Sequence, residues 1–83
     1  MYSKDAEIAK TLELSAKPAS DFVNAAKKYR SDIYIVNKQV QVNAKSILAV
    51  LACALRPGTK VSLKAEGPDE VEAVNKLCEI IQG

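Results

Sequence analysis

The stretch DIYIVNKQVQV, residues 32–42, decides the fold. Its first five residues are β-branched, aromatic or acidic, and residues 39–42 alternate between polar and apolar side chains, as strands do. Asn37 and Lys38 lie between the two runs, and we expect a tight turn there because asparagine tolerates a positive φ. The stretch therefore predicts a β-hairpin.

Two further segments have the same two-residue period. From Tyr2 to Leu14 the even positions carry most of the apolar residues, which predicts a strand that ends near Ala9. Residues 60–65, KVSLKA, alternate in the same way and predict a fourth strand. Four strands with one apolar face each indicate a sheet with one buried side.

Three segments have a helical period instead. The first covers residues 16–29, with Pro18 in its first turn. The second is a short apolar helix after Ser46, and the third follows Pro68 with acidic residues in its first turns. Their apolar stripes are Ala19, Phe22, Val23, Ala26 and Tyr29; then Ile47, Leu48, Leu51 and Leu55; then Val71, Val74, Leu77, Cys78 and Ile81.

The order β-α-β-β-α-β-α within 83 residues points to an α+β fold. Three amphipathic helices need one apolar sheet face to cover, so we expect a two-layer, open-faced β-sandwich with a solvated outer face. We expect residues 1–83 to form a single domain.

Composition excludes several classes of function. The net charge of +2 is low for a nucleic-acid-binding domain, and the apolar run at residues 47–55 is too short to span a bilayer. The chain contains no histidine, and Cys53 and Cys78 form no metal-binding spacing, so we expect buried thiols and no metal or cofactor. Because the N-terminus lacks an apolar signal segment, we expect a cytoplasmic protein. From the low charge and the short apolar run we expect no direct binding to nucleic acid or membrane.

Two local patterns at this spacing resemble HPr, the histidine phosphocarrier of the bacterial sugar phosphotransferase system. Residues 13–19, ELSAKPA, resemble its phosphohistidine site, with Ser15 where the family has histidine and Lys17 where it has arginine. Residues 45–51, KSILAVL, resemble its regulatory-serine site around Ser46. The resemblance extends over nearly the whole chain, and residues 61–67, VSLKAEG, also carry it. It implies an antiparallel sheet in the order 1-4-2-3 with all three helices on one face.

The first pattern has lost the chemistry of a phosphocarrier. A phosphoserine ester lacks the transfer potential of a phosphohistidine, and Ser15 has no histidine to serve as its general base. Lys17 keeps a charge but loses the planar fork of arginine, and Glu13 adds a negative charge where a phosphoryl group would arrive. We therefore expect no phosphoryl relay and no enzyme activity. Ser15 is better interpreted as the N-cap of the first helix, with a weak anion site beside Lys17 as the lesser alternative.

The second pattern allows two compatible roles for Ser46. It can cap the short helix, and by resemblance it is the serine that an HPr kinase phosphorylates. The family presents an apolar surface beside this serine, which corresponds here to Ile47, Leu48 and Leu51. By the same resemblance, Lys17 also contacts the partner. Inward packing is as good an interpretation as exposure for Leu48, whereas we expect Ile47 and Leu51 to be exposed.

The resemblance to histidine-lacking family members that act in catabolite repression gives the leading functional hypothesis. In this hypothesis an HPr kinase phosphorylates Ser46 of a regulatory, monomeric protein, and the modified helix surface, with Lys17, then binds a carbon-regulating transcription factor. The alternative is an unmodified structural or decoy module that binds Enzyme I-type components of the phosphotransferase system. A third hypothesis is a small RNA-binding domain that uses the open sheet face, which offers Tyr34 but no RNP pattern.

Overall fold

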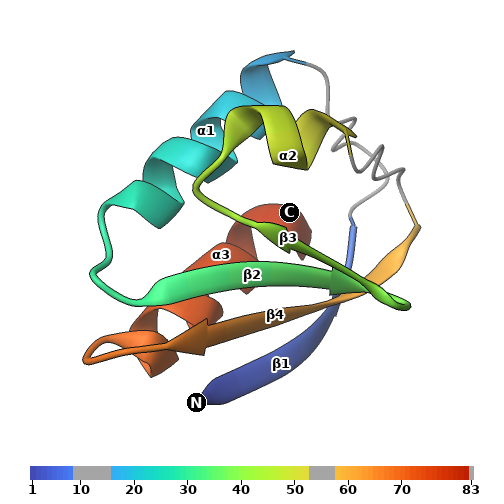
Figure 1. The fold of residues 1–83 in the computed structure, drawn as a ribbon. Helices are drawn as coiled ribbons and strands as arrows, with labels where there is room; N and C mark the ends of the chain where they lie inside the picture. The colour runs from blue at the N-terminus through green and yellow to red at the C-terminus, as the bar shows by residue number, and fades with distance from the viewer. Residues whose placement is uncertain (9–15, 53–57, 83) are drawn as a thin grey trace.

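The computed structural model describes residues 1–8, 16–52 and 58–82. Within them the chain follows the predicted order of elements (Figure 1). The elements are β1 (Tyr2–Glu7), α1 (Ala16–Lys27), β2 (Asp32–Asn37), β3 (Val40–Asn43), α2 (Ile47–Ala52), β4 (Lys60–Glu66) and α3 (Glu70–Gln82).

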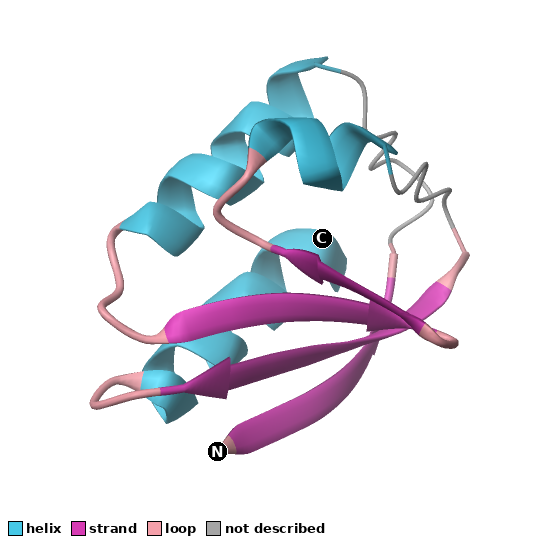
Figure 2. Ribbon diagram, in the orientation of Figure 1, coloured by secondary structure: helices cyan, strands magenta, loops and turns pink. Residues whose placement is uncertain are grey.

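The four strands form one antiparallel sheet in the order β1-β4-β2-β3, as the resemblance implied. Leu63 of β4 lies opposite Ile35 of β2, and Ile35 in turn lies opposite Val42 of β3, so apolar residues meet on one face. The helices cover that face, and the other face stays open (Figure 2). The predicted open-faced α+β sandwich is confirmed.

The core lies between the inner sheet face and the helices. Alternate strand positions contribute Ile33 and Leu63, and the helices contribute Phe22, Val50 and Leu77, all with an exposed fraction of 1% or less. Val50 lies outside the apolar stripe predicted for the second helix. Burying each such side chain stabilises the fold by about 1.5–3 kcal/mol. The intervening strand residues point outward, which explains why one face of the sheet is solvated.

Several predicted boundaries differ from the structure, and the first strand, for example, ends at Glu7 rather than near Ala9. The helix α1 ends at Lys27 rather than at residue 29, because the N–H groups of Lys28 and Tyr29 donate to carbonyls three residues back and tighten the last turn. The turn of the hairpin is shifted by one residue. Asn37 pairs with Val40 as the last residue of β2, so Lys38 and not Asn37 takes the positive φ, at 57°.

A hydrogen-bonded latch joins the start of β2 to the start of α3. The fully buried Ser31 donates its hydroxyl to Asp69, which also accepts from the N–H groups of Arg30 (2.9 Å) and Ser31 (3.0 Å). The backbone at Gly67 lies so close to Ser31 that only glycine fits, since a Cβ at this position would lie 2.6 Å from the Cα of Ser31. The latch therefore fixes where α3 begins on the sheet.

The latch changes the acidity of its carboxyl group. The hydroxyl of Ser31, followed by the N–H of Arg30, lowers the pKa of Asp69 from 3.8 to about 2. A carboxylate with a lowered folded-state pKa stabilises the fold fully above its unfolded-state pKa. That stabilisation is lost as the pH falls toward the folded-state value. The relevant window for Asp69 therefore lies between about pH 4 and about pH 2.

We expect Asp69→Asn to lower the free energy of unfolding at pH 7, because an amide N–H replaces one acceptor oxygen in front of a backbone N–H. The gap between the wild type and the variant should narrow as the pH falls from about 4 to 2. Urea denaturation across this range measures the gap. Asp21→Asn, which changes an exposed carboxylate on α1, is the control. A constant gap between wild type and Asp69→Asn at all pH values would contradict this assignment.

Candidate functional site

The short helix α2 presents different side chains inward and outward. Ile47 and Val50 are three residues apart and face the core, with Val50 buried and Ile47 half-buried against it. Leu48 and Leu51, also three residues apart, are 77% and 38% exposed. The prediction that Ile47 is exposed is therefore wrong, the one for Leu51 is confirmed, and Leu48 is the most exposed of the three.

Ser46 caps this helix, as predicted. Its hydroxyl oxygen accepts from the N–H of Ala49 at 3.3 Å, and its carbonyl accepts from the N–H of Val50 at 3.0 Å. Its own N–H donates to the carbonyl of Asn43 at 3.1 Å. Ser46 is half-buried, so its hydroxyl lies at the border between the capped helix and solvent.

The loop before Ser46 is held by its neighbours on several sides. The N–H of Ala44 donates to the carbonyl of Ile33 at 2.9 Å, and the N–H of Lys45 donates to the Asn43 side-chain oxygen at 2.9 Å. The ammonium group of Lys45 donates to the carbonyl of Tyr29 at 2.8 Å. Sequence reasoning gave no role to Lys45, because its partner lies sixteen residues away and no local pattern marks it.

The degenerate phosphohistidine pattern falls mostly outside the described residues. Ser15 and the side chain of Lys17 belong to that part, so the capping role of Ser15 and the place of Lys17 stay predictions. The helix α1 does begin at Ala16, directly after the predicted cap. Since α1 packs against α2, the two serine patterns belong to neighbouring helices (Figure 1).

The charges of the chain are unevenly distributed along the sequence. No acidic residue occurs between Asp32 and Glu66. The same stretch carries Lys38, Lys45, Arg56, Lys60 and Lys64. The exposed leucines of α2 therefore belong to a segment with only positive charges. This signal was visible in the sequence, although the low net charge of +2 conceals it.

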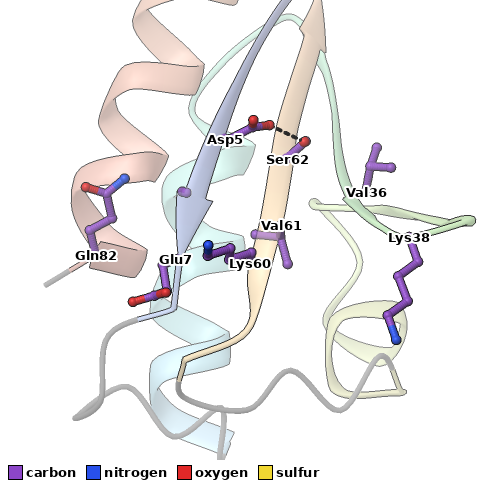
Figure 3. A pocket seen from close by; sticks show the side chains of 9 residues that line it. Asp5, Glu7, Val36, Lys38, Lys60, Val61, Ser62 and Gln82 are labelled. Carbon is purple, nitrogen blue, oxygen red and sulfur yellow. Dashed lines mark hydrogen bonds between the residues drawn. The ribbon is translucent and has the colours of Figure 1, made fainter.

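A hollow of about 790 Å³ lies at the end of the sheet where β1 ends and β4 begins (Figure 3). Outward-facing side chains of mixed charge line most of it, and the hydroxyl of Ser62 donates to Asp5 at 2.6 Å. The lining residues are Asp5, Ala6, Glu7, Val36, Lys38, Lys60, Val61, Ser62 and Gln82. The alternation of the strands predicted that most of these side chains face outward but not that they enclose a hollow.

The described part of the chain offers little else for chemistry. It contains no group of three histidine, cysteine or acidic residues that could hold a metal ion. None of its helices is long and apolar enough to cross a membrane. Cys78 is a buried free thiol, as predicted, and burial raises its pKa. Cys53 lies outside the described residues.

Known proteins are similar to this chain in both fold and sequence. A family model described as "PTS HPr component phosphorylation site" matches residues 2–83. The HPr-like protein Crh of Bacillus subtilis is 38% identical over 82 residues, which cover 99% of this chain and 96% of that protein. The crystal structure of HPr-C-His from Thermoanaerobacter tengcongensis matches with a TM-score of 0.91 at 38% identity, covering 98% of this chain and 91% of the other.

A crystal structure of Bacillus subtilis Crh, described as a catabolite repression protein that forms a swapped dimer, matches with a TM-score of 0.79 at 38% identity. The match covers 92% of this chain and 83% of that one. Fold and sequence together define a phosphocarrier-type domain. The chain belongs to the HPr family.

We expect Ser46→Ala to lower the free energy of unfolding by about 1 kcal/mol, because the N–H of Ala49 loses its side-chain acceptor. Ser46→Asp should keep most of the stability, since aspartate caps helices as well as serine does. Urea denaturation of both variants measures the difference. A Ser46→Ala variant as stable as the wild type would show that the cap contributes nothing.

Proposed function

We propose that this chain is a regulatory HPr-family protein without phosphoryl-relay or enzyme activity, which acts in carbon catabolite regulation. The proposal rests on one observation above all: Ser46, at the position of the family's regulatory serine, caps a helix whose second residue, Leu48, is 77% exposed. A modifiable hydroxyl and an apolar contact surface thus lie side by side. We propose that it acts in the cytoplasm.

The absence of relay activity follows from the side chains. Phosphoryl relay needs a nucleophile whose phosphorylated form transfers readily, and imidazole provides this near neutral pH. The chain has no histidine at all, and Ser15 occupies the position where the family carries it. A hydroxyl without a general base cannot take over either half of the reaction.

Charge supports a regulatory role for Ser46. A phosphoryl group adds about −1.5 to −2 charges at neutral pH. It would enter a stretch of sequence that has no acidic residue between positions 32 and 66. Modification would therefore give α2 a negative charge in an otherwise positive segment. A partner can distinguish such a change by charge complementarity.

The contact surface suggests the kind of partner. Leu48 and Leu51 point away from the core, and exposed leucines on a short helix contribute little to folding. We propose that they contact an HPr kinase and, after modification, a transcription factor that controls carbon use. The kinship with Crh supports this choice of partner class. Ile47, which packs against the core, contributes mainly by holding α2 in place.

We expect an HPr kinase with ATP to add one phosphoryl group to the wild type and none to Ser46→Asp. Intact-mass measurement detects the product, and a histidine-containing HPr in the same reaction confirms that the kinase is active. An unmodified wild type beside a modified HPr would contradict the proposal. Binding of that unmodified protein to Enzyme I would then favour the decoy alternative.

We expect Leu48→Ser to lower kcat/KM for this phosphorylation about tenfold, because a contact residue at the centre of a small interface contributes at least about 1.4 kcal/mol. Val71→Ser is the matched control, since Val71 is 50% exposed on α3, outside the α2 surface. Equal losses in the two variants would show that α2 is not the contact surface.

A further inference from the structure

The side chain of Lys45 connects two elements that are distant in the sequence. Its ammonium group donates to the carbonyl of Tyr29 at 2.8 Å, just after the end of α1, and the contact is partly buried. A charged donor forms a stronger hydrogen bond than a neutral one, and the C-terminal end of a helix favours a positive charge. The contact is therefore a stable link between α1 and the loop that leads into α2.

The other hydrogen bonds of this loop do not reach α1. Ala44 is bonded to β2 through Ile33, and the N–H groups of Lys45 and Ser46 are bonded to Asn43, at the end of β3. In the part of the chain that the structure describes, the Lys45 side chain thus provides the hydrogen bond between residues 44–46 and the turn that directly follows α1. We refer to this hydrogen bond as the Lys45 clamp.

The clamp matters because the position of α2 depends on contacts with the rest of the chain. The helix has six residues, which is too short for a helix that is stable by itself, and Val50 is its one buried residue. Its location therefore depends on the contacts at its ends. At the N-terminal end these contacts are Ile47 packed against the core, the cap of Ser46 and, one residue earlier, the Lys45 clamp.

We propose that Lys45 is a positioning residue for the phosphorylation of Ser46: the Lys45 clamp fixes the Ser46 hydroxyl relative to α1 and so determines how readily a kinase modifies it. This inference rests on the proposed function. The ammonium group is engaged by the Tyr29 carbonyl, so Lys45 acts through the place of Ser46 rather than as a free surface charge.

Hydrogen exchange of the unmodified protein tests the positioning directly. In Lys45→Met the protection of the Ala49 and Val50 amides, which are bonded to Ser46, should fall about tenfold. Lys45→Arg keeps a charged donor and should preserve the protection. Lys38→Met removes an exposed positive charge on the β2–β3 turn and should leave it unchanged. Far-UV circular dichroism verifies folding, and Lys45→Gln replaces Lys45→Met should that variant fail to fold.

The same variants in the kinase reaction test the consequence. We expect kcat/KM to fall about tenfold for Lys45→Met and to be restored in Lys45→Arg, with Lys38→Met equal to the wild type. Equal losses for Lys45→Met and Lys38→Met, or unchanged amide protection in Lys45→Met, would overturn the inference. An unmodified wild type would instead overturn the proposed function, and the exchange experiment alone would then decide whether the clamp positions Ser46.

Discussion

Burial of one sheet face under the helices is the constraint on which the rest of the structure depends. Ile33 and Leu63 sit at alternate strand positions, and Phe22 and Leu77 meet them from α1 and α3. Ordering a chain of this size costs conformational entropy that only such burial can offset. The Ser31–Asp69 latch depends on this burial, because it forms only when the helices are packed on the sheet. Its groups lie 38 residues apart and meet only when α3 lies on the sheet.

The helix α2 contributes differently from the other two. It supplies Val50 to the core, whereas α1 and α3 each supply several fully buried side chains. A helix with so little burial is a poor stabilising element, but its outer side can carry leucines without any effect on the core. At its N-terminal end, hydrogen bonds from Ser46 and Lys45 supplement the packing of Ile47 in fixing the position of the helix. An exposed apolar surface and a precise location are thereby compatible.

Periodicity in the sequence predicted every element, because strands and helices each place apolar residues on one side. The strand order came from the family resemblance. What could not be predicted depends on pairing over distance. The hairpin turn shifted because sheet register places Asn37 opposite Val40. Ile47 was expected to be exposed, and the side of Leu48 stayed open, because α2 is apolar nearly all round and its pattern does not define an inward face.

The two serine patterns carry different weight as evidence for function. Ser46 has a folding role as a cap, so its presence alone would be explained without any modification. Leu48 has no such role, since 77% of its surface is exposed on a helix that gains nothing from the exposure. The exposed leucine is therefore the feature that folding leaves unexplained and that the proposed contact with a partner accounts for.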